Sequence, residues 1–216
     1  MIYTQDPAEQ TTAITDIILA LVAFGGILFL VWQPANINEL WKLTIWSAAL
    51  GMIGLAASLG AAAHGLIISR TVYDRIWQLL NMTLALAVSL FVVGVVYDLW
   101  GPTACFKALP VMLFAGLVFF VATLVYPGIF FVFIVYQGLS LIFAFSAYVY
   151  LTVRGGLTGA GFMAAGILLS ILAAGIQANQ SISLTVVWRF DHNGIYHIVQ
   201  VIGLMLLVYG IRLSML

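Results

Sequence analysis

Seven long apolar runs constrain the fold of this chain more than any other feature. They cover residues 13–32, 43–68, 76–99, 108–126, 129–152, 157–178 and 195–213. Each is close to the roughly 20 apolar residues that an α-helix needs to cross a bilayer. We therefore predict an all-α fold, an integral membrane bundle of seven transmembrane helices.

The composition agrees with a membrane protein. Hydrophobic residues make up 64% of the chain and charged residues only 6%, whereas soluble domains contain about 25% charged residues. The seven acidic and seven basic residues cancel, so we expect no nucleic acid as a partner. The single cysteine, Cys105, excludes an intrachain disulfide.

The connectors between the runs are too short for a second folded domain. We expect one seven-helix transmembrane domain over residues 1–216. Acidic residues rather than Lys or Arg precede the first run, which argues for a retained span and against a signal peptide. With the amino terminus outside, the inner connectors hold four Lys or Arg and the outer ones three, and the acidic amino terminus favours this orientation.

Small residues recur at every fourth position in two of the runs. They are Gly54, Ser58 and Ala62 in the second run, and Gly166, Ser170 and Ala174 in the sixth. This spacing lets helix backbones approach closely. We expect the second and sixth helices to be interior or tightly paired.

All three histidines fall in one layer of the predicted bundle. His64 lies about one turn before the end of the second run, His197 about one turn after the start of the seventh, and His192 just before it. With seven spans these positions share one side of the membrane, and His64 and His197 lie roughly 5 Å inside their helix ends.

Three imidazoles with an open position for water form a known catalytic zinc site. The layer therefore favours a metal site that binds zinc. A hydrogen-bonded packing role for each histidine, a structural polar cluster, and haem or another ligand are the alternatives.

The spacing of the two later histidines complicates a shared site. Five residues along a regular helix correspond to a rotation of about 140°, which points His192 and His197 apart. An N-cap at Asp191 or Asn193, with Gly194 easing the start of the helix, would let His192 approach from non-helical backbone. A π-bulge would be another solution.

Asp74 is the candidate catalytic carboxylate, because it follows His64 by ten residues and comes just before the third run. It suits the N-cap of the third helix, or a general base that faces the metal. Polar residues nearby are candidates to orient the ligands, and several also suit a membrane interface. They are Tyr73, Gln78, Asn81, Asp191, Tyr196 and Gln200.

In this arrangement the chain resembles the CREST superfamily of membrane hydrolases, which includes the alkaline ceramidases and the progestin and adipoQ receptors. The resemblance is carried by His64 near the end of the second span, Asp74 at the start of the third, and His192 and His197 at the seventh. The order Asp-His-Asn-Gly-Ile-Tyr-His is most similar to an uncharacterised bacterial branch.

The resemblance implies a zinc ion held by His64, His192 and His197, with Asp74 assisting a zinc-activated water. The implied reaction is hydrolysis of an amide or ester in a membrane lipid. It also implies a bacterial inner membrane, and the orientation favoured by the charges places the amino terminus and the metal site on the periplasmic side. Two features depart from the family pattern: Gly60 stands where relatives have a serine, and their two later histidines are four residues apart.

The sequence can also be compared with other classes of membrane protein. A retinal protein needs a lysine in the middle of the seventh span, whereas Lys42 and Lys107 flank earlier spans. A secondary transporter would show broken helices or ionisable residues near the midplane, for which Pro110 and Gln137 are weak hints. The serious alternative is a non-enzymatic seven-span receptor or sensor with a structural metal site.

Overall fold

The computed structural model describes residues 2–32, 39–126 and 130–216. It contains six helices in the described residues, and all six are long and apolar enough to cross a membrane. They are α1 (Pro7–Val31), α2 (Leu40–Gly65), α3 (Arg70–Val125), α4 (Phe130–Arg154), α5 (Ala160–Ala178) and α6 (His192–Leu213).

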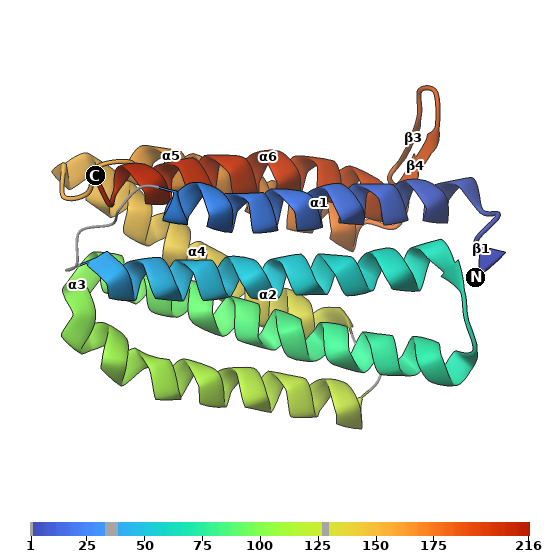
Figure 1. Ribbon diagram of the computed structural model, residues 1–216, viewed down its shortest axis with the longest axis horizontal. Coiled ribbons are helices and arrows are strands. Elements are labelled where there is room, and N and C mark those ends of the chain that lie inside the picture. Colours follow the sequence, from blue (N-terminus) through green and yellow to red (C-terminus); the bar gives the residue numbers. More distant parts are fainter. Residues whose placement is uncertain (1, 33–38, 127–129) are drawn as a thin grey trace.

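The helix count differs from the sequence prediction at α3. The predicted third and fourth helices, 76–99 and 108–126, are joined in this one element, which is interrupted at Gly101 with φ 79° and ψ −174°. Glycine adopts this backbone conformation without a Cβ clash, and Pro102 suits the first turn of the helix that follows. The two arms of α3 run in opposite directions on either side of Gly101 (Figure 1).

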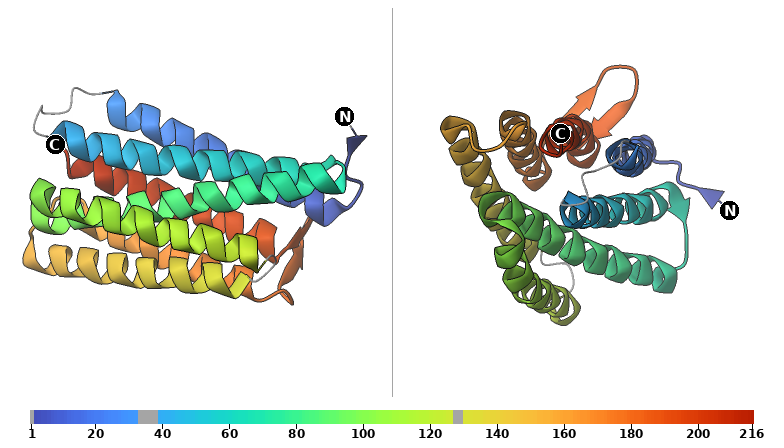
Figure 2. Two further views of the ribbon diagram at one scale, coloured as in Figure 1. Left: turned by 90° about the horizontal axis from the view of Figure 1, so that it is seen from below. Right: turned by 60° about the vertical axis from the view of Figure 1, so that its left-hand side comes forward.

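The helices form a closed ring in chain order. Each helix packs against the next, and α6 packs back on α1; the right-hand view of Figure 2 looks obliquely along this ring. Large side chains with almost no exposure fill its interior, among them Trp46, Tyr148, Met163 and Leu204. Buried residues of α1 and α3, such as Leu30 and Val95, belong to the same core, so all six described helices share it.

The small residues of the sixth predicted span allow a close contact between α5 and α6. A Cβ added at Gly166 would lie 2.5 Å from the carbonyl oxygen of Gly203. In α2, a Cβ at Gly54 would lie 2.7 Å from the ring of Phe24 in α1. Both helices are thus tightly paired, as the spacing of small residues predicts.

Four short strands extend one end of the bundle. β1 (Ile2–Tyr3) pairs antiparallel with β2 (Leu66–Ile67), and β3 (Ser183–Thr185) pairs antiparallel with β4 (Arg189–Asp191). These strands were not expected from the sequence. They lie where α2 ends and α6 begins (Figure 1), so they tie the amino terminus and the start of α6 to that end of the bundle.

Helix α1 starts six residues before the first predicted span. Asp6 caps it by accepting a hydrogen bond of 2.9 Å from the backbone N–H of Ala8, and Pro7 takes the first helical position. The extra turns carry Glu9, Thr11 and Thr12 to the end of the bundle where the strands lie.

Candidate functional site

The three histidines lie at one end of the bundle, on two helices that flank α1. His64 is the residue before the last of α2, His192 is the first residue of α6, and His197 lies one turn further along α6. The amino-terminal turns of α1 pack between these helix ends (Figure 1). The structure therefore brings His64 and His197 to the same level, as the counting of spans predicts.

His197 is buried and both of its ring nitrogens have partners from α1. Its Nε2 lies 3.2 Å from Oδ1 of Asp16, and its Nδ1 lies 3.2 Å from Oγ1 of Thr15. The Thr15 hydroxyl donates its proton to the carbonyl of Thr12 at 2.9 Å, so it can only accept from His197. His197 therefore carries a proton on Nδ1 and presents Nε2 to Asp16.

The contact between His197 and Asp16 needs one further proton, on the imidazole or on the carboxyl group. Asp16 is only 3% exposed, and its other oxygen, Oδ2, is buried without a hydrogen-bond partner among the described residues. A buried polar atom without a partner is costly. This pair therefore holds one proton, and its carboxyl group keeps one buried oxygen without a hydrogen-bond partner among the described residues.

Gly60 of α2 leaves the space in which the Asp16 carboxyl group sits. A Cβ added at Gly60 would lie 2.8 Å from Oδ2 and 2.9 Å from Oδ1 of Asp16. Gly60 thus has a structural reason, since any side chain there would collide with the Asp16 carboxyl group. Asp16 is a candidate that was not identified from the sequence, although it lies inside the first predicted span, 13–32.

His64 pairs with a second carboxylate from α1. Its Nδ1 lies 2.7 Å from Oε2 of Glu9, and its side chain is 17% exposed. The ring of Trp77 from α3 approaches His64 edge-on, with the ring centroids 6.1 Å apart. His64 also interacts electrostatically with His197. Each of these histidines is therefore held against a carboxylate of α1.

Asp191 caps α6, as one of the two predicted N-cap positions. Its Oδ1 accepts hydrogen bonds of 2.9 Å from the backbone N–H of Gly194 and 2.9 Å from the hydroxyl of Thr12. Thr11 donates to the carbonyl of Arg189 at 2.7 Å. The threonines of α1 thus join this helix to the start of α6, beside the Asp16 and His197 pair.

His192 does not approach from non-helical backbone. It is the first helical residue after the Asp191 cap, and α6 runs through His197 as a regular α-helix without a π-bulge. The five-residue separation therefore keeps the rotation of about 140° between His192 and His197. The predicted N-cap at Asp191 is thus present, but neither a non-helical His192 nor a π-bulge occurs in this described segment.

Asp74 forms an exposed ion pair with Arg70 of the same helix, α3. Its two carboxylate oxygens lie 3.0 Å and 3.2 Å from Nε of Arg70, and its side chain is 48% exposed. Ser69 caps α3 by accepting a 3.4 Å hydrogen bond from Val72 N–H, so the N-cap role considered for Asp74 is wrong. Asp74 has no ion pair with a histidine in the described residues.

The remaining predicted residues are dispersed. Tyr73 packs on Trp77, with ring centroids 6.0 Å apart, and Gln78 accepts a 3.4 Å hydrogen bond from Arg75. Asn81 lies further along α3, half-buried. Tyr196 lies beside Gln137 and interacts electrostatically with Asp16, whereas Gln200 donates to Ser170 of α5 at 3.1 Å. Only Tyr196 of this group adjoins the buried pair.

The donor chemistry of the cluster suits zinc, but the arrangement does not present a formed site. His64, His197, Asp16 and Glu9 are side chains of the types that bind zinc, and Asp16 Oδ2 is a buried atom without a partner. However, the described residues contain no group of three or more His, Cys, Asp or Glu side chains placed to hold a metal ion. Since both nitrogens of His197 are used, His197 would have to exchange Asp16 or Thr15 for a metal.

The fold and the cluster define a class: a ring of membrane-length helices with histidine and carboxylate pairs at one end. Residues 11–215 match a family of unknown function, DUF6962, and the chain belongs to this family. The match includes Asp16 and all three histidines. No curated protein and no solved structure matches the chain.

Proposed function

We propose that this protein is a membrane-embedded hydrolase that cleaves an amide or ester bond in a membrane lipid. In this proposal the two arms of α3 each cross the bilayer, which makes seven crossings from the six described helices. The amino terminus and the histidines face the outer side of a bacterial inner membrane. The low charge and the apolar helices support membrane insertion.

One observation carries the proposal: the buried Asp16 and His197 pair, in which His197 lies about one turn inside the start of α6 and interacts electrostatically with His64. Ionisable residues inside membrane helices are costly, so they usually mark functional sites. At this depth a lipid can present the carbonyl beside its headgroup without leaving the bilayer. The pair is thus suited to a substrate that lies in the membrane.

The residues of this chain suggest how protons would move. In its form without the shared proton, the pair of Asp16 carboxylate and His197 imidazole can accept a proton from water. That proton is then shared between Oδ1 and Nε2, and the pair can return it to the leaving group. The hydroxyl of Thr15 fixes the imidazole orientation through Nδ1. We therefore assign the general-base role to Asp16 rather than to Asp74, whose carboxylate pairs with Arg70.

The residues that would hold zinc are His64, His197 and Asp16, after His197 has exchanged Thr15 for the metal. Asp16 would then use Oδ2 for the metal and keep Oδ1 for the proton shared with His197. A bound zinc supplies a Lewis acid for the scissile carbonyl and lowers the pKa of a bound water. Placing Asp16 among the ligands would also explain why its Oδ2 lacks a hydrogen-bond partner.

The assignment is tested by turnover of ceramides, N-acyl amines and lysolipids by the protein reconstituted in vesicles. Asp16→Asn should lower the hydrolysis rate by at least about 100-fold, the usual scale of general acid–base catalysis. Glu39→Gln, which alters a carboxylate before α2 at the opposite end of the bundle, is the matched control. Loss of turnover in Asp74→Asn but not in Asp16→Asn would return the general-base role to Asp74.

A second candidate is a non-enzymatic membrane receptor or sensor with a structural metal site. It is favoured by Gly60. The hydrolases that the chain resembles have a serine at this position, whereas here the Asp16 carboxyl group occupies the space. A receptor would bind zinc and lipids without hydrolysing any of the three substrate classes. Zinc binding without turnover therefore selects this candidate over the hydrolase.

A further inference from the structure

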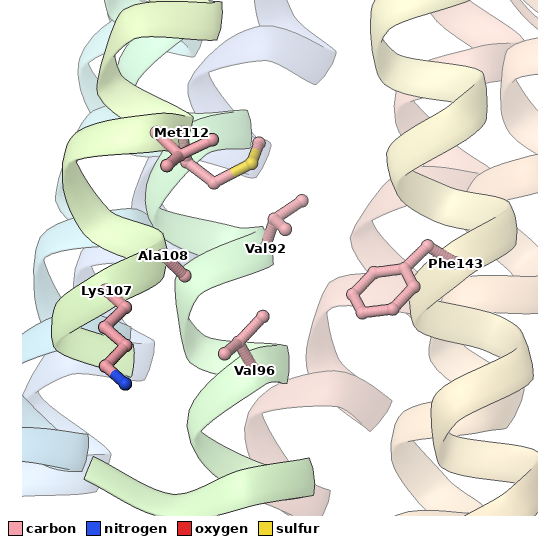
Figure 3. A pocket seen from close by; sticks show the side chains of 7 residues that line it. Val92, Val96, Lys107, Ala108, Met112 and Phe143 are labelled. Carbon is pink, nitrogen blue, oxygen red and sulfur yellow. The ribbon is translucent and has the colours of Figure 1, made fainter. Parts of the chain in front are cut away.

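A second feature lies outside the histidine layer, in a hollow between α3 and α4 (Figure 3). Its volume is about 500 Å³, within the range of roughly 300–1,000 Å³ that is typical of ligand pockets. Val92 and Val96 of the first arm of α3 face Phe143 of α4 across it, and Met112 of the second arm closes one end. The walls are therefore apolar.

Lys107 is the one charged side chain that lines this hollow. It is exposed and has no ion pair within the described residues. The other lysine, Lys42, is in contrast buried and lies 2.7 Å from Asp98. Lys107 thus offers an uncompensated positive charge at the end of the hollow nearer to Gly101.

Aromatic side chains mark the same level of the bundle. Trp100 is 63% exposed and stacks on Phe143, with the ring centroids 6.4 Å apart. Trp41 and Phe106 are also exposed and lie 5.1 Å apart between ring centroids. Exposed tryptophans typically lie at the headgroup level of a membrane. The Lys107 ammonium group would therefore reach lipid phosphates while the hollow lies beside the acyl chains.

We propose that this hollow binds an acyl chain of an anionic phospholipid, with the lipid phosphate on Lys107. The apolar walls fit the chain, and the single cation at the rim complements a net negative headgroup. The proposal rests on membrane insertion of the proposed function, but not on the histidines or on hydrolysis. It assigns the hollow to a bound lipid from the bilayer rather than to the substrate of the histidine layer.

The test uses the full-length protein in phosphatidylcholine vesicles that contain a photoactivatable acyl lipid, either phosphatidylglycerol or phosphatidylcholine. Cross-linked peptides should contain Val92, Val96 or Phe143, and phosphatidylglycerol should label them more strongly than phosphatidylcholine. Lys107→Gln should lower the phosphatidylglycerol labelling about fivefold, the effect of one basic residue near an anionic membrane surface. Arg154→Gln, an exposed cation at the same end of the bundle, should leave it unchanged.

Ala108→Trp provides a second variant, because its indole would fill the hollow and reduce labelling by both lipids. Equal labelling by the two lipids, or labelling that Lys107→Gln does not change, would overturn the phosphate assignment. Cross-links between two copies of the chain through these same peptides would assign the hollow to a dimer interface instead. Each outcome is independent of lipid hydrolysis, which separates it from the test of the proposed function.

Discussion

At the scale of single residues, the contact between Gly60 and Asp16 adds a buried carboxyl group to the candidate site. The sequence placed His64 and His197 at one level, because counting spans fixes which helix ends meet. It also found Asp191 as a cap, since capping is a local property. Asp16 was missed because its pairing with His197 joins residues that are 181 positions apart in the chain, and no local pattern marks such a contact.

Adding a side chain at Gly60 should destabilise the protein. Gly60→Ser or Gly60→Ala forces the Asp16 carboxyl group out of its place, at a cost of about 1–3 kcal/mol, as for other overpacked cores. Thermal unfolding in detergent measures the effect. Gly175→Ala is the matched control, since a Cβ there meets nothing within 4 Å. Equal stability of the Gly60 and Gly175 variants would show that Asp16 does not need this space.

At the scale of helices, the apolar runs predicted where the chain is helical but not how the helices end. The turn formers Gly101 and Pro102 lie where α3 reverses direction. Because only Gly101 has non-helical backbone angles there, the two arms form one continuous element. The strands escaped prediction because each has only two or three residues, too few for an alternating pattern. The start of α1 escaped because its first turns are polar.

A buried ion pair fastens α2, α3 and α4 at the end opposite the histidines. Lys42 Nζ lies 2.7 Å from Oδ1 of Asp98, both side chains are almost fully buried, and the Tyr148 hydroxyl donates to Asp98 Oδ2 at 2.8 Å. Lys42→Met should cost about 3–5 kcal/mol, because it leaves a buried carboxylate without its partner. Unfolding in detergent tests this value.

The matched control is Lys107→Met, which removes an exposed lysine and should change stability little. The double variant Lys42→Met with Asp98→Leu should recover much of the loss, since no buried charge is left alone. A single Lys42→Met variant as stable as Lys107→Met would contradict the view that this pair fastens the helices.

At the scale of the whole molecule, the ring of helices separates two polar layers. Histidines and carboxylates from α1, α2 and α6 meet at one end, and Lys42, Asp98 and Tyr148 meet at the other. The all-α character and the membrane-length helices could be predicted from hydropathy, because the length of an apolar run gives the length of a membrane-spanning helix. The partners inside each layer required the structure, since they depend on how helices rotate against one another.

In the proposed function, His64, His197 and Asp16 form one unit that would bind zinc. The most direct measurement is the zinc content of the purified protein after removal of free metal, compared with its His64→Ala, His197→Ala, Asp16→Ala and His192→Ala variants. We expect about one zinc per chain, lost in the first three variants and retained in His192→Ala, because His192 lies on a different side of α6. Zinc that is absent from the unmodified protein, or that only His192→Ala removes, would contradict the claim.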